Sequence, residues 1–179
     1  YNNKVLSFGS EVFEMCDGAV PLRNSYDPKV MVECAIKLLD TPYRWGGKSV
    51  MGIDCSAFVQ LCAKVSGYKL PRDASQQARE GDRLEIAPDF SNLQPGDLIF
   101  FGRKAENGQK ERVVHVAFYI GNKRFIHSQG DVRIGSFDKQ DSLFDEFNLG
   151  RLLFATRFLP YINKVENMNT TDKNPYYQP

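Results

Sequence analysis

One stretch decides the fold, and it reads Tyr43-Arg44-Trp45-Gly46-Gly47 and then Gly52-Ile53-Asp54-Cys55-Ser56-Ala57-Phe58-Val59. It is a glycine-rich loop that leads directly into an apolar helix. Asp54 is a natural N-cap residue, so Cys55 lies in the first turn of that helix. The positive end of the helix dipole favours a thiolate at this place. The sequence therefore predicts that Cys55 is a nucleophile whose pKa is lowered.

The chain contains only two histidines, and both come after the cysteine on segments with the pattern of strands. The Gly121-Asn122 turn lies between His115 and His127 and predicts an antiparallel hairpin. In the expected register the numbers of paired residues add up to about 243, and those of His115 and His127 add up to 242, so both imidazoles are expected side by side on one face. His115 then takes the thiol proton, and His127 holds the far nitrogen of His115 in one tautomer.

Length and charge limit the classes of protein to consider. The 179 residues suit one domain with a sizeable core. The 23 basic and 22 acidic residues leave a formal net charge of +1, so no excess of charge indicates binding to nucleic acid or to an anionic membrane. No apolar run is long enough to predict a transmembrane segment.

The remaining cysteines are predicted to be structural. Cys34 and Cys62 fall in helical apolar patterns, where a free cysteine behaves as a small hydrophobic residue. The spacings of the four cysteines do not fit a zinc site, and no metal ligand set is predicted. A disulfide among Cys16, Cys34 and Cys62 stays open.

The order of the predicted elements indicates an α+β fold. Helices are expected after Asp27-Pro28 and after Asp54, with a short one after Leu70-Pro71. Consecutive strands joined by turns follow, and helices before strands predict N-terminal helices packed on an antiparallel sheet of about five strands. The expected strands are 98–101, 113–120, 123–127, 132–136 and 152–159.

We expect three parts along the chain. Residues 1–27 hold short strand-like pieces and form an N-terminal extension or the edge of an upstream domain. Residues 28–161 form the catalytic domain. Residues 162–179 are polar and poor in aliphatic side chains, which predicts a mobile tail.

Six motifs in one order make the chain resemble the NlpC/P60 family of papain-like cysteine peptidases, which cut bacterial cell-wall peptides. The resemblance covers roughly residues 29–159. The motifs are Thr41-Pro42-Tyr43-Arg44-Trp45-Gly46-Gly47, Asp54-Cys55-Ser56, Leu70-Pro71-Arg72, Leu93-Gln94-Pro95-Gly96-Asp97-Leu98-Ile99-Phe100-Phe101, His115-Val116-Ala117-Phe118-Tyr119-Ile120-Gly121 and Phe125-Ile126-His127-Ser128.

The resemblance implies a role for each matching position. Cys55 would be the nucleophile, His115 the general base and His127 the orienting third residue. Tyr43 matches a tyrosine whose hydroxyl lies near the oxyanion, with the backbone N–H of Cys55 as a second donor. Asp54 and Ser56 match positions that bind the free α-amino group of an N-terminal L-alanine in dipeptide-releasing members.

The implied activity is that of a cysteine endopeptidase. It would hydrolyse the bond between D-γ-glutamate and a diamino acid, meso-diaminopimelate or L-lysine, in peptidoglycan stem peptides. The partner is then a murein peptide, and no cofactor is implied. Two alternatives stay open: an amidase or acyltransferase that uses the same Cys–His pair, and a catalytically silent wall-binding module.

Family members often carry an upstream SH3-like domain that closes one end of the groove, and residues 1–27 are a candidate for its edge. Wall hydrolysis predicts an extracytoplasmic location, in the periplasm or cell envelope, whereas recycling of released peptides predicts a cytoplasmic one. We expect a monomer.

Two nearby residues receive structural interpretations. Trp45 is expected to shape the glycine-rich loop by packing, without touching substrate. Arg72 is interpreted either as a carboxylate sensor or as one half of a structural salt bridge. Both interpretations depend on burial, which the sequence alone does not give.

Overall fold

The computed structural model describes residues 5–8, 11–14, 27–66, 68–106 and 108–157. At the N-terminus, β1 (Val5–Phe8) pairs antiparallel with β2 (Glu11–Glu14). The rest of the predicted extension, the predicted tail at 162–179 and the pairing of Cys16 lie outside the described residues. The boundaries of the three expected parts therefore stay predictions.

The helices begin where the sequence predicts. In α1 (Pro28–Ile36), the Asp27 side chain accepts a hydrogen bond from the Lys29 backbone at 2.9 Å. In α2 (Cys55–Val65), Asp54 accepts one from the Ala57 backbone at 2.8 Å. These caps satisfy backbone donors that have no partner within the helix. Two short helices follow, α3 (Ala74–Gln77) and α4 (Glu146–Gly150).

The main sheet is antiparallel and has six strands in the order β5-β10-β6-β7-β8-β9. Five of them match the predicted strands. The sixth, at one edge, was missed because its three residues are mostly exposed and carry no alternating apolar pattern. The strands are β5 (Asp82–Leu84), β6 (Leu98–Arg103), β7 (Arg112–Gly121), β8 (Arg124–Gln129), β9 (Asp131–Ser136) and β10 (Leu152–Arg157).

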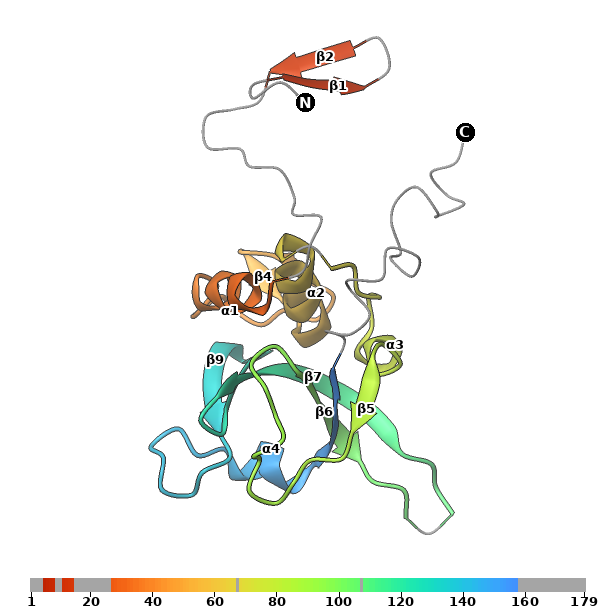
Figure 1. The fold of residues 1–179 in the computed structure, drawn as a ribbon, viewed down its shortest axis with the longest axis vertical. Helices are drawn as coiled ribbons and strands as arrows, with labels where there is room; N and C mark the ends of the chain where they lie inside the picture. Colours follow the sequence, from red (N-terminus) through yellow and green to blue (C-terminus); the bar gives the residue numbers. More distant parts are fainter. Residues whose placement is uncertain (1–4, 9–10, 15–26, 67, 107, 158–179) are drawn as a thin grey trace.

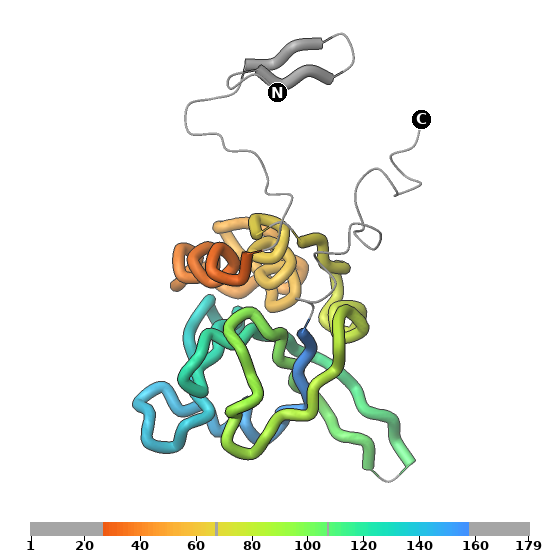
Figure 2. The backbone as a smooth tube through the Cα atoms, viewed as in Figure 1, coloured from red at the N-terminus to blue at the C-terminus, as the bar shows by residue number. Residues whose placement is uncertain are grey.

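Hydrophobic side chains are buried on both faces of this sheet. Helices α1 and α2 lie on one side of it (Figure 1) and pack with alternate strand residues such as Phe100 and Phe118. The ring of Phe58 on α2 stacks on Phe118, with centroids 5.4 Å apart. The opposite face carries Phe101 and Phe125, which pack with side chains of the chain between β5 and β6 and of α4; Figure 2 traces that segment beside the sheet.

In the β7–β8 hairpin, the numbers of paired residues add up to 244, since Phe118 lies opposite Ile126 and Tyr119 lies opposite Phe125. The numbers of His115 and His127 add up to 242, so these residues occupy diagonal positions instead of the expected directly opposed ones. Because the difference is two residues, it preserves the alternation of side chains, and the two imidazoles still share a face.

A separate small hairpin builds the loop ahead of α2. Strands β3 (Lys48–Ser49) and β4 (Gly52–Ile53) pair antiparallel, and neither was predicted. Gly47 and Gly52 allow this close turn, since a Cβ at Gly47 would lie 2.3 Å from the Gly52 carbonyl oxygen. The glycines of the motif thus let two backbone segments touch immediately before the helix that carries Cys55.

Candidate active site

A cavity of about 410 Å³ lies over the start of α2. It brings together three segments that are distant in the sequence: the loop before α2, the turn that leads into α3, and the beginning of β7. Its lining residues are Tyr43, Trp45, Gly46, Asp54, Cys55, Ser56, Arg72, Asp73, Ala74, Ser75, Val113 and Val114.

Cys55 is in the first helical turn, as predicted, and it is buried. Burial raises the pKa of the Cys55 thiol, whereas hydrogen bonds from the backbone of Val116, of Ser56 and of Cys55 itself lower it, and the net result is a raised pKa. The prediction of a lowered pKa is therefore wrong for the ligand-free protein. The helix start supplies donors, but the loss of water around the sulfur outweighs them.

The two histidines form a direct pair. Nε2 of His115 lies 2.8 Å from Nδ1 of His127, and both side chains are buried. Val116, which follows His115 along β7, hydrogen-bonds the Cys55 sulfur through its backbone. The imidazole pair and the cysteine are thus linked through adjacent residues of β7, and the relay from Cys55 to His115 to His127 stays a prediction. A base at Nδ1 of His115 requires the proton on Nε2, which donates to His127.

Both imidazoles are held in the neutral form. Burial lowers the pKa of His115 well below its usual 6.5, and the nearby charges of His127 and Arg151 lower it further. Burial also lowers the pKa of His127 to about 4. Near pH 7 the site therefore contains a thiol and two neutral imidazoles.

Aromatic rings fix the histidines in place. Phe101 lies 5.6 Å from the ring of His115, and Phe125 meets the ring of His127 edge-on at 5.1 Å. Gly135 permits this packing, because a Cβ there would lie 2.5 Å from the Phe125 ring. Nε2 of His127 is buried and has no hydrogen-bond partner among the described residues.

Backbone contacts join the two halves of the site. The Ser128 hydroxyl, next to His127, donates to the Ile53 carbonyl at 2.8 Å. The Tyr43 backbone N–H donates to the Gly130 carbonyl, also at 2.8 Å. These bonds tie the loop ahead of the nucleophile to the end of β8, so the distance between Cys55 and the histidines is set by main-chain geometry.

Asp54 is saturated with hydrogen bonds. Besides capping α2, it accepts bonds from the Gly46 backbone, from Ser56 and from both terminal nitrogens of Arg72, the shortest at 2.5 Å. Arg72 also donates to the Ser56 hydroxyl at 2.9 Å. Burial would raise the pKa of Asp54, but these donors lower it overall. Of the two interpretations of Arg72, the structure shows the salt bridge.

Tyr43 is half-buried in the cavity wall. Burial raises its pKa first, and the nearby Cys55 and Asp54 charges raise it further. The phenol is therefore protonated throughout the neutral range and is able to donate a hydrogen bond. The cavity thus contains Tyr43, Asp54, Cys55 and Ser56 together, while His115 and His127 lie beside it on β7 and β8.

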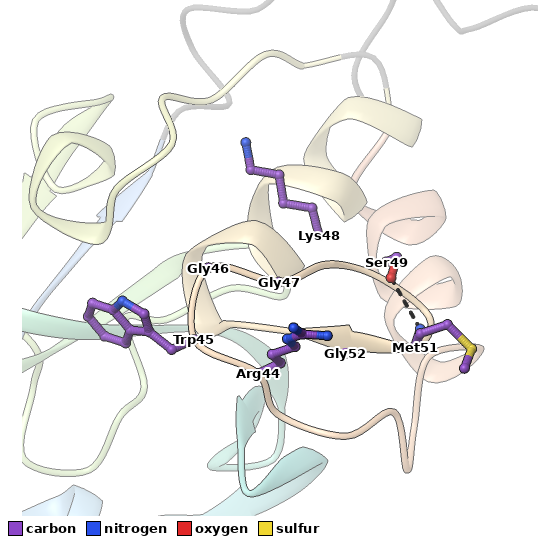
Figure 3. A pocket seen from close by; sticks show the side chains of 8 residues that line it. All are labelled: Arg44, Trp45, Gly46, Gly47, Lys48, Ser49, Met51 and Gly52. Carbon is purple, nitrogen blue, oxygen red and sulfur yellow. Dashed lines mark hydrogen bonds between the residues drawn. The ribbon is translucent and has the colours of Figure 1, made fainter.

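Trp45 does not pack as predicted, since its side chain is 85 % exposed. Figure 3 shows the indole pointing away from the β3–β4 hairpin, beside a second cavity of about 310 Å³ that is lined by residues 44–49, 51 and 52. Trp45 and Gly46 line both cavities. The aromatic ring is therefore at the rim of the candidate site and free to meet a ligand.

Sequence reasoning missed Gln77. Its side chain is fully buried, and its Nε2 donates to the carbonyls of Ser56 and Pro71 at 2.9 Å each. Gln77 therefore fastens α3 to the start of α2. The capping box of Asp73 and Gln76 is a signal for the short helix, but nothing in a single sequence marks which glutamine turns inward.

Within the described residues, no group of three or more potential metal ligands comes together, and no helix is long and apolar enough to cross a bilayer. The structure pairs two imidazoles, and Val116, the residue after His115, hydrogen-bonds the Cys55 sulfur through its backbone. A cysteine activated by a histidine that a third residue orients is the arrangement of a thiol hydrolase.

Comparison with known proteins identifies the family of the chain. Residues 40–149 match the NlpC/P60 family. The chain is 46 % identical over 90 residues to the gamma-D-glutamyl-L-lysine dipeptidyl-peptidase of Bacillus cereus, covering 50 % of this chain and 25 % of that protein. It is 32 % identical over 126 residues to the Bacillus subtilis protein of that name, covering 70 % and 40 %.

A crystal structure of an NlpC/P60 family protein from Bacillus cereus superimposes with a TM-score of 0.64 at 29 % identity, covering 84 % of this chain and 45 % of that one. The chain belongs to the NlpC/P60 family and has its α+β fold. It spans between a quarter and two fifths of the length of the two Bacillus relatives.

Proposed function

We propose that the protein is a cysteine endopeptidase that hydrolyses the D-γ-glutamyl–diamino acid bond of peptidoglycan stem peptides. The observation that carries the proposal is the 2.8 Å contact between the two imidazoles, beside a cysteine whose sulfur is bonded to the backbone of Val116. The names of the two Bacillus relatives support the γ-glutamyl bond.

The reaction begins from neutral partners. Nδ1 of His115 takes the thiol proton, and the Cys55 sulfur attacks the γ-carbonyl of D-glutamate. His127 accepts the Nε2–H bond of His115 and so holds Nδ1 as the acceptor. The negative charge on the carbonyl oxygen is stabilised by the Tyr43 hydroxyl and by the backbone N–H of Cys55.

The second half of the reaction returns the protons. The tetrahedral intermediate collapses, the C–N bond breaks, and His115 gives its proton to the leaving amine. Water then attacks the acyl-enzyme, with His115 as the base again, and releases the free thiol and the γ-carboxylate. The overall change is hydrolysis of one amide bond, and no other reactant is consumed.

Asp54 and Ser56 are the proposed receptors for a free α-amino group of the substrate. Their geometry makes this a demanding role, because Arg72 already neutralises Asp54 and bonds Ser56. An ammonium group that binds there must share the Asp54 carboxylate with a guanidinium. We therefore expect the subsite to hold the amine weakly unless the Tyr43 side of the cavity contributes.

The proposed setting is the cell envelope, where the chain acts as a monomer on murein peptides. An upstream SH3-like domain next to residues 28–161 would close the groove and favour free stem peptides over intact wall. The exposed Trp45 lies at the rim of the cavity, and such a domain would determine whether this side chain is covered.

The test compares four peptides: L-Ala-γ-D-Glu-diaminopimelate, its lysine analogue, and the N-acetylated form of each. Mass spectrometry should detect L-Ala-γ-D-Glu from the free peptides, and Cys55→Ala should release none. Cleavage at another bond contradicts the proposed specificity. Equal rates on free and N-acetylated peptides contradict the role of Asp54 and Ser56.

A further inference from the structure

Arg151 immediately follows α4 and lies against the rear of the histidine pair. Its guanidinium carbon lies 4.5 Å from the ring centroid of Phe147 and 5.7 Å from that of Phe101. The Phe101 ring in turn packs against His115, with centroids 5.6 Å apart. The cation is therefore separated from the proposed general base by one aromatic ring.

Two neutral amides hold this guanidinium in place. Nε and Nη2 of Arg151 donate to Oδ1 of Asn148 at 2.9 and 2.6 Å, and Nη2 donates to Oε1 of Gln129 at 3.0 Å. Gln129 comes two residues after His127 on β8. Asn148 is fully buried, and its backbone and side-chain amides both donate to Asp145.

None of the ion pairs between described residues includes Arg151. Asp145 is held at the far side of Asn148 and reaches Arg151 only through space. A half-buried cation without a carboxylate in direct contact is screened less than a fully exposed one, although water on its exposed side and the more distant Asp145 weaken its field. That field acts on Cys55 as well as on the imidazoles.

The charges that face the imidazoles come from four elements. Burial is the largest influence on both histidines. Among the charges near His127, Asp145 has the largest effect and raises its pKa, Arg151 and Arg133 lower it, and Asp131 raises it. The facing groups are His115 on β7, His127 on β8, Asp131 and Arg133 on β9, and Asp145 and Arg151 at the two ends of α4.

We propose that Arg151 is a positioning residue of the Cys55 site, fixed by Asn148 and Gln129 so that its charge adds to burial in keeping His115 and His127 in the neutral form that accepts a proton. The inference rests on the proposed function, in which His115 is the base. The same charge disfavours the imidazolium that forms after proton transfer, and so it promotes donation of that proton to the leaving amine.

The test uses the two histidines as its probe, since the chain contains no others. The ring Cε1–H signals of the full chain are followed by NMR from pH 8 to pH 4 and assigned with His127→Gln. Arg151→Gln should raise the His127 midpoint above its value of about 4 by roughly half a pH unit or more. Arg151→Lys keeps the charge and should restore most of the original midpoint.

Asp145→Asn is the matched variant of opposite sign. Asparagine still caps α4, so the helix is retained while the negative charge is lost. The protonated fraction of His127 at pH 4 should then fall. Arg124→Gln is the control, because Arg124 pairs with Asp141 at the exposed end of β8 and does not face the imidazoles.

A structural role alone predicts a different result. If Arg151→Gln and Asp145→Asn leave both midpoints unchanged, or shift them in the same direction, the proposal is wrong, whatever happens to activity. The acid limb of kcat/KM should move in the direction of the NMR midpoints. Because the NMR titration requires no substrate, a protein that fails to cleave γ-glutamyl peptides contradicts the proposed function and leaves this test intact.

Discussion

The helix side and the sheet side of the site stabilise their polar groups in opposite ways. Asp54 keeps its charge at the start of α2 by accepting hydrogen bonds from Gly46, Ser56, Ala57 and Arg72. On the sheet, His115 and His127 are deprived of water and of charged partners in direct contact, and they stay neutral. On the helix side, hydrogen bonds to a charged carboxylate therefore hold the structure rigid. On the sheet side, burial keeps the imidazoles neutral and able to take up a proton.

Because of this difference, the two sides are suited to different roles. A carboxylate that is saturated with donors resists change and suits a structural or binding role. Two imidazoles that share one hydrogen bond in dry surroundings are ready to receive a proton and to return it. Cys55 lies between the two sides: it belongs to α2, but its sulfur is hydrogen-bonded to the backbone of Val116 on β7.

The largest expected effect comes from removing the base on the sheet side. His115→Ala should lower kcat/KM for the γ-glutamyl peptide by roughly 10³-fold or more, because no other group takes the thiol proton. His127→Gln should cost less, roughly 10- to 100-fold, since glutamine still accepts a hydrogen bond. Steady-state kinetics measures both, and a His127→Gln loss as large as that of His115→Ala would contradict the assigned order.

The pH dependence of stability should separate the two sides. The unfolded chain protonates a histidine near pH 6.5, whereas folded His127 stays neutral to about pH 4, so acidification through this window should cost about 3 kcal/mol of unfolding free energy. Asp54 has a lowered pKa, so its contribution is present above pH ~4 and is lost only below it.

Urea unfolding at a series of pH values measures both windows. His127→Gln should reduce the slope of the curve between pH 6.5 and 4, where His115 supplies the remaining slope, and Asp54→Asn should flatten the curve only below pH ~4. If both variants change the same window, the contrast between a neutral side and a charged side does not hold.

Breaking the charged side should have a smaller effect on stability. Arg72→Gln leaves a buried carboxylate with its backbone donors but without its cation, and we expect a loss of about 2 kcal/mol in unfolding free energy at pH 7. Lys123→Gln, which removes an exposed pair with Asp138, is the control and should change it by less than about 0.5 kcal/mol. Equal losses would show that the Asp54 pair behaves as an ordinary surface pair.

The smallest effect on stability is expected at the rim. Trp45→Ala removes a side chain that is 85 % exposed, so unfolding free energy should change by less than about 0.5 kcal/mol. A rise in KM at constant kcat would place the indole against bound substrate. A stability loss above about 1.5 kcal/mol would restore the packing role that the sequence suggests.

Much of the fold can be predicted from short sequence patterns. Asp27-Pro28 and Asp54 mark helix starts, and apolar runs mark five of the six strands of the main sheet. Such patterns do not predict strand β5, because it is short and exposed. Its position depends on pairing with β10, which is distant in the sequence. Long-range pairing of this kind leaves no local pattern.

For the candidate site, the sequence predicts the placement of the two histidines better than it predicts the charges. The shared face of His115 and His127 follows from the alternation of a strand, and it is kept because the observed pairing differs from direct opposition by two residues. The raised pKa of Cys55 and the exposure of Trp45 depend on how much water the whole fold removes or leaves. Neither can be read from the neighbours of a residue in the chain.

The hydrogen bond between the Cys55 sulfur and the Val116 backbone joins two elements that are synthesised at different times. During synthesis, the helix that carries the thiol leaves the ribosome some sixty residues ahead of the strand that supplies its donor and its base. A chain that stops before β7 holds a cysteine without its catalytic surroundings. The three proposed catalytic residues, Cys55, His115 and His127, are therefore all present only after β8 has been synthesised.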